Sequence, residues 1–310
     1  ARPETRSEMV APLRSGGRVI GVFNLESDRE NAYTAHELEL LESFAGQAAT
    51  ALERARLLEQ EEGKRRLDQE LRIARRIQLT FLPRFSERLR DLGLAGRTIP
   101  SKEMSGDYYD FLEKEDGTVA LALADVSGKG IPASLIMSSL RAAFRLQAGQ
   151  EQDPGELCRT LNEFLLASLR ETEFVTGVFG FLNPVTGTFR YSSAGHEPPL
   201  LLSGDGSVEG LKTGGMILGA FPDQVYEAGE ISLEQGDLLL LYTDGVTEVY
   251  RSDRGEFGRE GLVSAVRANS QESPRELLSA VIRSVREFAQ GPLPDDLTLV
   301  AVAGPREGGS

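Results

Sequence analysis

The sequence predicts an α+β fold with a mainly antiparallel sheet, and three features of the chain carry that prediction. From about residue 95 onward, short apolar segments of strand length are separated by turn residues. Helical patterns are grouped beside these segments and do not alternate strictly with them, which favours α+β over a parallel α/β sheet. The N-terminal part differs, because one hairpin pattern is followed there by a single long helical pattern.

The hairpin pattern covers residues 9–26. Two apolar segments flank Ser15, Gly16 and Gly17, and the glycines can supply the positive φ angles that a tight hairpin turn needs. A lone hairpin is not stable by itself in water. We therefore expect upstream residues outside this sequence or a partner chain to pack on it.

One continuous helix is predicted over residues 35–82. Thr34 and Glu37 match a capping box at its start, and Pro83 stops it. Its second half carries a heptad-like seam of Leu67, Leu71, Ala74, Gln78 and Phe81. We expect this helix to be a linker that pairs with its copy in a homodimer.

The elements after residue 95 are predicted from apolar runs and from helical periodicity. The expected strands are residues 118–124, 174–182, 187–192, 198–203, 237–243 and 297–303. The expected helices are residues 132–148, 154–170 and 274–289. Hairpin turns are predicted at "KEDGTV" (114–119) and "NPVTGT" (183–188).

Composition narrows the classes of function. The 310-residue chain carries a net charge of −14, which argues against nucleic acid as a partner. Its one cysteine, Cys158, cannot form a disulfide within the chain, so we expect a reducing compartment, the cytoplasm. The apolar stretches are too short for a membrane segment. The opening "ARPETRSE" has no Met, which favours a piece of a longer protein.

Several acidic residues stand at the ends of the most apolar strands. Asp125 and Asp244 follow such strands, Asp295 and Asp296 precede one, and Asp107 begins an aromatic stretch. In an antiparallel arrangement the end of one strand lies beside the start of its neighbour, so these acids could converge at one end of the core. Converging carboxylates repel one another and need protons or cations to coexist.

The residue types favour a hard cation at such a site. The chain has two histidines and one cysteine, which disfavours zinc. An all-oxygen donor set suits Mg²⁺ or Mn²⁺. A single Asp before Gly can also be an ordinary turn residue, and we interpret Asp116 and Asp205 in that way.

Five motifs carry a resemblance to a known family. They are "SGDYYDF" (105–111), "ADVSGKGIPASL" (124–135), "SSAGHEPPLLL" (192–202), "LYTDGVTE" (241–248) and "DDLTLV" (295–300). In this order they resemble bacterial metal-dependent serine/threonine phosphatases of the PPM family, in the sporulation stage II E and sigma-B-regulator branch. The resemblance runs from about residue 69 to residue 303, and residues 1–60 resemble the C-terminal end of a GAF sensor domain.

The resemblance implies a domain organisation. It predicts the C-terminal part of a GAF-like domain at 1–44, a coiled-coil-like linker helix at 45–83, a PPM-type phosphatase domain at 84–305 and a tail at 306–310. The phosphatase domain should be an antiparallel β-sandwich flanked by helices.

The resemblance also implies a site for two Mn²⁺ or Mg²⁺ ions. Asp125 should bridge both ions, and the Val126 carbonyl should bind one of them. Asp244 and Asp295 should hold the other ion, and Asp107 should act on the first, directly or through water.

Three further residues are candidates for substrate binding. Gly128 and Lys129 lie in "SGKG", where many family members have histidine in place of the lysine. Lys129 could reach a bound phosphate or could simply be solvated. His196, in "AGHEPP", could touch substrate, but the interpretation we favour is that it fixes its loop.

The function implied is hydrolysis of phosphoserine or phosphothreonine by water that the two ions activate. The substrate would be a phosphorylated regulatory protein, such as an anti-sigma-factor antagonist, and the sensor and linker helix would regulate the reaction. The alternative is a phosphatase-like scaffold that binds without turnover. A two-metal nucleotide phosphodiesterase and a pure ligand sensor are weaker rivals.

Overall fold

The computed structural model describes residues 4–83, 86–102 and 104–305, and the chain divides into two compact units. The boundary falls between Leu71 and Arg72. The tail expected at 306–310 lies outside the described residues.

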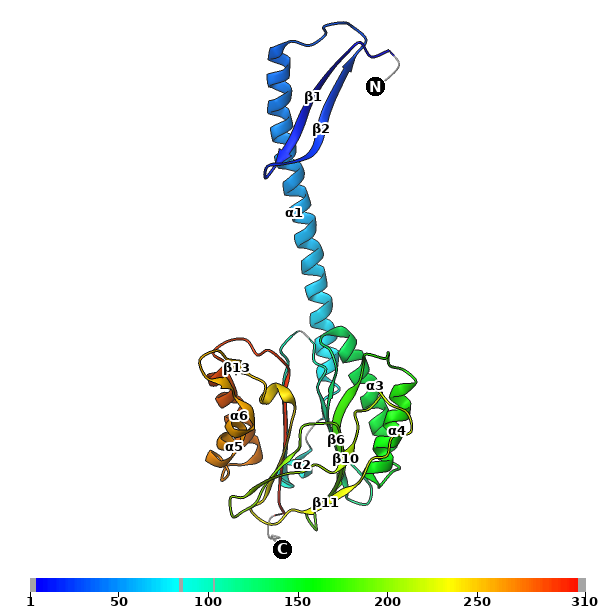
Figure 1. The fold of residues 1–310 in the computed structure, drawn as a ribbon, viewed down its shortest axis with the longest axis vertical. Helices are drawn as coiled ribbons and strands as arrows, with labels where there is room; N and C mark the ends of the chain where they lie inside the picture. Colours follow the sequence, from blue (N-terminus) through cyan, green and yellow to red (C-terminus); the bar gives the residue numbers. More distant parts are fainter. Residues whose placement is uncertain (1–3, 84–85, 103, 306–310) are drawn as a thin grey trace. The chain divides into compact units, whose positions relative to one another are not determined.

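Unit 1 contains the predicted hairpin and most of the predicted long helix. Its elements are β1 (Ser7–Ser15), β2 (Arg18–Ser27) and α1 (Ala35–Leu79), the last of which continues into unit 2. Ser15 pairs with Arg18, and the turn glycines between them have φ angles of 52° and 80°. A small apolar core joins hairpin to helix, formed by Met9, Ala11, Leu13, Leu41, Ala45 and Ala49. The hairpin prediction is confirmed (Figure 1).

Helix α1 begins as the sequence predicts. The Thr34 amide donates to Glu37 Oε2 at 2.6 Å, and the Glu37 amide donates to Thr34 Oγ1 at 3.4 Å, which completes the capping box. The helix ends at Leu79 rather than at residue 82.

The predicted seam along α1 is wrong for its last two members. Gln78 is buried, and its side-chain amide donates to Ser105 O at 2.6 Å and accepts from the Ser105 amide at 3.2 Å. Phe81 packs against the core of unit 2. These two side chains have the spacing of a dimer seam, but the fold of unit 2 engages both of them.

The described part of unit 2 is built from two sheets, each covered by helices (Figure 1). The first sheet has the order β10-β7-β6-β5-β4, and β11 pairs with β7. Its strands are β4 (Tyr108–Glu113), β5 (Val119–Val126), β6 (Val175–Leu182), β7 (Thr188–Ala194), β10 (Gly214–Gly215) and β11 (Gly229–Ser232). Its central strands are antiparallel, as predicted.

The second sheet has the order β3-β15-β12-β8-β9 and is antiparallel throughout. Its strands are β3 (Leu94–Ile99), β8 (Leu200–Leu202), β9 (Val208–Gly210), β12 (Leu238–Tyr242) and β15 (Leu297–Ala303). A separate small hairpin consists of β13 (Tyr250–Arg251) and β14 (Gly255–Glu256).

Helices α3 (Ile131–Ala148) and α4 (Pro154–Leu166) cover the outer face of the first sheet, and α5 (Gly258–Ala268) and α6 (Pro274–Ala289) cover that of the second. Unit 2 also contains α2 (Glu87–Asp91) and the 3₁₀ turn η1 (Asp244–Val246). Buried residues of α3 and α4 share a core with the first sheet, and those of α5 and α6 share one with the second. A third core lies between the sheets, so the unit is a sandwich flanked by helices, as predicted.

Period-two alternation explains why the strands read as continuous apolar runs. In β5, Ala122 and Ala124 belong to the core under α3 and α4, whereas Leu121 and Leu123 belong to the core between the sheets. Both faces of the strand are buried, so no polar face interrupts the run.

Strand β3 and helix α5 were not predicted from the sequence. Strand β3 carries Gly96 and Arg97 and lies at a sheet edge, so its apolar run is interrupted. Helix α5 begins at Gly258 and contains Gly261, and glycine has a low helix propensity. Gly96 is required by packing, because a Cβ there would lie 2.3 Å from the Tyr109 ring.

A partly buried ion pair joins α3 to β4. Asp110 is fully buried, and Arg145 donates to its two carboxylate oxygens at 2.6 and 2.8 Å. The Tyr108 hydroxyl donates to the same carboxylate at 2.6 Å. Asp110 lies in the "SGDYYDF" motif, yet it faces the helix layer and holds α3 in place.

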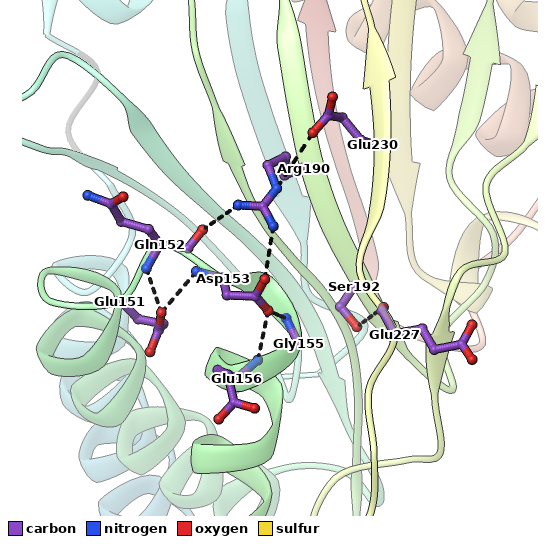
Figure 2. Close-up of polar contacts among 9 residues, drawn as sticks. All are labelled: Glu151, Gln152, Asp153, Gly155, Glu156, Arg190, Ser192, Glu227 and Glu230. Atoms are coloured by element: carbon purple, nitrogen blue, oxygen red, sulfur yellow. Dashed lines mark hydrogen bonds and ion pairs between the residues drawn. The ribbon is translucent and has the colours of Figure 1, made fainter.

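A second polar cluster fixes the start of α4 (Figure 2). Asp153 caps the helix by accepting from the amides of Gly155 at 2.8 Å and Glu156 at 3.1 Å. Arg190 of β7 donates to the other oxygen of Asp153 at 2.9 Å and pairs with Glu230 of β11 at 3.6 Å. One arginine thus ties the helix layer to two strands.

No helix within residues 4–83, 86–102 and 104–305 is both long enough and apolar enough to cross a membrane.

Candidate metal centre

Strand alternation directs acids from the first sheet into one end of the space between the sheets. Leu123 faces the core between the sheets, and Asp125 is two residues further along β5. Tyr109 faces the same core, and Asp107 lies two residues before it, just before β4 begins. Strands β4 and β5 are antiparallel neighbours, so the start of one lies beside the end of the other.

The second sheet brings two more acids to the same end. Strands β12 and β15 are antiparallel, and the Thr243 amide donates to Thr298 O at 3.1 Å just beyond their ladder. Asp244 therefore follows β12 where Asp295 precedes β15. The convergence that the sequence suggests is an outcome of this pairing.

Gly245 permits the close approach of these two segments. It lies in η1, directly after Asp244, and a Cβ on it would lie 1.9 Å from Asp296 O and 3.3 Å from Asp295 Cβ. No side chain larger than hydrogen fits there without moving the backbone. The Asp-Gly pair is therefore a packing requirement in addition to a turn.

Two threonines that the sequence analysis missed orient Asp107. The Thr243 hydroxyl donates to Asp107 Oδ2 at 2.9 Å and accepts from the Thr298 amide at 3.0 Å. Asp107 is only 3% exposed, so one oxygen of a buried carboxylate is fixed by a buried hydroxyl. The alternation of the apolar runs could have identified both threonines, because each continues the face that points between the sheets.

Asp296 holds the loop that precedes β4. Its Oδ1 accepts from the Ser101 amide at 2.7 Å and from the Ser101 hydroxyl at 2.9 Å, and its Oδ2 accepts from the Gly106 amide at 3.0 Å. These bonds use both oxygens, and they agree with a structural role for this acid.

The pKa values show that the acids act on one another. Burial, then the charge of Asp125, raises the pKa of Asp107 well above its usual range. Burial, then the charge of Asp244, raises the pKa of Asp125 to about 7, although a hydrogen bond with Asp107 works in the opposite direction. Burial, then the charge of Asp295, raises the pKa of Asp244. The four predicted acids therefore form one electrostatic group.

Three more candidate residues border this group. Lys129 Nζ lies 2.6 Å from Asp295 Oδ2. The Val126 carbonyl oxygen faces Gly106, where a Cβ would lie 3.0 Å from it. Gly128 has a φ of 91° and nothing within 4 Å of its Cβ position, so the turn before Lys129 is uncrowded.

His196 links the two sheets next to the acids. Its Nε2 lies 3.1 Å from Tyr242 O, and its Nδ1 lies 2.8 Å from Thr176 Oγ1. Because a carbonyl can only accept, Nε2 carries the proton and Nδ1 accepts from the hydroxyl. Thr176 pairs with Asp125 in the ladder, and Tyr242 is two residues before Asp244. Both ring nitrogens are engaged within the protein, which favours the interpretation that His196 fixes its loop.

We expect His196→Gln to flatten the pH dependence of stability between about pH 6.5 and pH 4. Burial lowers the pKa of His196 to about 4 from an unfolded value of about 6.5. The folded state therefore binds fewer protons across this window, so wild-type stability is full above pH 6.5 and falls as the pH drops. Part of the His196 residue remains accessible to solvent. We therefore expect the free energy of unfolding of wild type to fall across this window by about 1–2 kcal/mol more than that of His196→Gln, which is less than the whole pKa shift would give.

Urea denaturation between about pH 7 and pH 5 measures this effect. His36→Gln is the matched control, because His36 is the chain's other histidine and lies exposed on α1. Equal pH dependence in wild type and His196→Gln would contradict the prediction.

The donor set fits hard divalent cations. Carboxylates with a backbone carbonyl nearby are the oxygen ligands that Mg²⁺ and Mn²⁺ prefer. Burial first, and then the charges of neighbouring carboxylates, raise the pKa values of Asp107, Asp125 and Asp244, and a bound cation would offset both effects. Among the described residues, however, no group of three or more His, Cys, Asp or Glu side chains is already arranged to hold a metal ion. The ligand roles of Asp107, Asp125, Val126, Asp244 and Asp295 remain predictions.

Comparison with known families agrees with this architecture. Residues 115–304 match the stage II sporulation protein E (SpoIIE) family. Residues 1–53 match the GAF domain family.

Individual relatives and solved structures point the same way. The chain is 32% identical to the phosphoserine phosphatase RsbU of Bacillus subtilis over 75% of this chain and 69% of that protein. The SiaA-PP2C domain of Pseudomonas aeruginosa superposes with a TM-score of 0.69 at 20% identity, over 78% of this chain and 98% of that one. The catalytic domain of the serine/threonine phosphatase PstP, solved with 2 manganese ions, superposes with a TM-score of 0.52 at 16% identity. The match covers 69% of this chain and 98% of that one. These matches agree with the sandwich fold and with the acidic residues at its end. The chain belongs to the SpoIIE family of PPM-type phosphatases.

Proposed function

We propose that this chain hydrolyses phosphoserine or phosphothreonine on a regulatory protein, with two divalent ions held at the acidic end of the sandwich. The observation that carries the proposal is the mutual effect of Asp107, Asp125, Asp244 and Asp295, which come from both sheets and meet as one electrostatic group. Burying that much like charge is costly unless cations complete the site.

Each predicted ligand has a distinct place in this proposal. Asp125 and the Val126 carbonyl end β5, and Asp125 would bridge the two ions. Asp244 and Asp295 would hold one ion, and Asp107, fixed by Thr243, would act on the other. When bound, such ions supply activated water and neutralise the charge that develops on the phosphoryl oxygens.

The chain's other reactive side chains are poorly placed for a covalent mechanism. Cys158 is fully buried in the core under α3 and α4, and burial raises the pKa of its thiol to about 12. His196 has both ring nitrogens engaged. Direct attack by water therefore fits the residues better than a phosphoenzyme.

The class of substrate is supported by the relatives. RsbU is a phosphoserine phosphatase, and the PstP domain is a serine/threonine phosphatase solved with manganese. By extension, a phosphorylated regulatory protein, such as an anti-sigma-factor antagonist, is the substrate proposed for this chain.

Regulation through the N-terminal part is proposed on two observations. Residues 1–53 match a sensor family, which supports the division into a GAF-like part at 1–44, a linker at 45–83 and a phosphatase domain at 84–305. The end of α1 is bonded to the site, because Gln78 holds both backbone groups of Ser105, two residues before Asp107. A signal that moves α1 would therefore act on Asp107.

The homodimer is proposed on the exposed apolar residues of α1. Leu52, Leu67, Ile73 and Ile77 are each more than half exposed. Pairing of two helices through such residues would remove them from water.

Asp244→Asn tests the proposed function. We expect the wild type to hydrolyse a serine-phosphorylated protein and an aryl phosphate only when Mn²⁺ or Mg²⁺ is present, and to lose both activities on chelation. The variant should lose about 10²-fold or more in rate with its fold intact, because one ligand of an ion is neutralised.

Asp205→Asn is the control for this variant, since Asp205 lies exposed in a hairpin turn. A wild type that binds the phosphoprotein without turnover at any metal concentration would contradict the proposal and support a scaffold.

A further inference from the structure

Lys129 occupies a defined position at the acidic end of the sandwich. Its ammonium lies 2.6 Å from Asp295 Oδ2 and donates to Pro294 O at 2.9 Å. The side chain therefore engages the segment that leads into β15, although it remains partly exposed to solvent. This contact leaves one N–H of the ammonium for any other partner.

The segment that carries Lys129 is uncrowded, and its ion pair is partly exposed. Gly128 and Gly130 flank it with φ angles of 91° and 78°, and no atom lies within 4 Å of either Cβ position. The lysine and Asp295 side chains are 39% and 34% exposed, so water can replace either partner. An ion pair of this kind can exchange without disturbing the core.

Lys129 acts on more than one acid of the group. The hydrogen bond that Lys129 donates to Asp295 raises the pKa of the lysine, and the charges of Asp296 and Asp244 act in the same direction, so the lysine stays cationic. In turn, the charge of Lys129 lowers the pKa of Asp244, against the larger effects of burial and Asp295. The acids assigned above to one ion thus already share a positive charge.

We propose that Lys129 is a built-in counter-ion that competes with a divalent cation for Asp295, and so weakens metal binding at Asp244 and Asp295. This inference rests on the proposed function, because it assumes that these two acids hold an ion. An ammonium on a carboxylate oxygen occupies a lone pair that a metal would use, and its charge repels a dication nearby. Lys129 would then be a positioning residue that sets metal affinity, and it would not be a residue that binds the substrate phosphate.

Calorimetric titration with Mn²⁺ tests the proposal on the full chain. We expect Lys129→Met to bind the Mn²⁺ ion assigned to Asp244 and Asp295 about three- to tenfold more tightly than wild type does. The factor is modest because the ion pair between Lys129 and Asp295 is partly exposed. Lys129→Arg keeps the positive charge and should retain wild-type affinity. Lys212→Met removes an exposed cation of the acidic chain elsewhere and should also leave the affinity unchanged.

Thermal unfolding gives a second readout that does not depend on turnover. Without metal, Lys129→Met should unfold at a lower temperature than wild type, because the acids lose their counter-ion. With saturating Mn²⁺ the variant should gain more in unfolding temperature than wild type gains.

The outcomes separate this inference from the proposed function. If wild type takes up no manganese, the metal centre itself is refuted. If wild type binds manganese and Lys129→Met binds it equally or more weakly, only the counter-ion role is refuted. A variant with unchanged manganese affinity and a raised KM for phosphoprotein would also refute that role, and would make Lys129 a substrate contact.

Discussion

Asp125→Asn should lower the phosphatase rate by about 10³-fold or more, equivalent to about 4 kcal/mol of transition-state stabilisation. Asparagine has the same shape but no charge, so it cannot bridge two cations as the carboxylate is expected to. The same change should make the metal-free protein more stable by about 1–2 kcal/mol, because it removes one charge from a crowded and partly buried group. Loss of activity together with a gain in stability is a signature that simple unfolding cannot produce.

Phosphoprotein hydrolysis with Mn²⁺ and urea denaturation without metal measure the two effects. Asp116→Asn is the matched control, because Asp116 is an exposed turn residue whose Oδ1 accepts from the Thr118 amide at 2.9 Å. The control should keep its activity. An Asp125→Asn protein with near-normal activity, or with clearly reduced metal-free stability, would contradict the assignment of Asp125.

Gly245→Ala should abolish activity and destabilise the fold by about 3 kcal/mol or more. The added methyl would lie 1.9 Å from Asp296 O, a backbone atom that cannot move without shifting the start of β15. The shift would carry Asp244 and Asp295 apart. Gly245→Ala should therefore lower the stability of the fold, as overpacking in a core does, and also disrupt the site.

The measurement is the unfolding temperature together with Mn²⁺-dependent hydrolysis. Gly291→Ala is the control, because its nearest contact would be an ordinary 3.8 Å to Ala289 O, and Gly291 also precedes β15. If Gly245→Ala matches this control in both measurements, the close approach at residue 245 does not matter for the site.

The sequence predicted the elements whose signal is local. The apolar run at 297–303 and the helix at 274–289 coincide with β15 and α6, because the first is a continuous apolar run, the second is strongly periodic, and turn or capping residues precede both. Asp125 and Asp244 were identified because a charge directly after a buried run is conspicuous in the sequence. Edge strand β3 and glycine-containing α5 were missed. Pairing with β15 stabilises β3, and packing on α6 stabilises α5, whereas their glycines lower the intrinsic strand and helix propensities of these segments.

The partners of the acids could not be predicted in the same way. Thr243 and Thr298 are unremarkable in sequence, and only the pairing of β12 with β15 places them against Asp107 from another sheet. Lys129 and Asp295 are 166 residues apart along the chain, and their contact exists only because the ends of β5 and β15 face each other across the sandwich.

The amino-acid sequence by itself determined the α+β class, the positions of the main strands and the presence of acids at their ends, because burial and turn formation depend on nearby residues. The tertiary structure alone decided which oxygens are held by hydroxyls and amides, which acids raise one another's pKa, and where Lys129 places its charge. These properties depend on distances between segments far apart in the chain, and such distances are set by the packing of the two sheets.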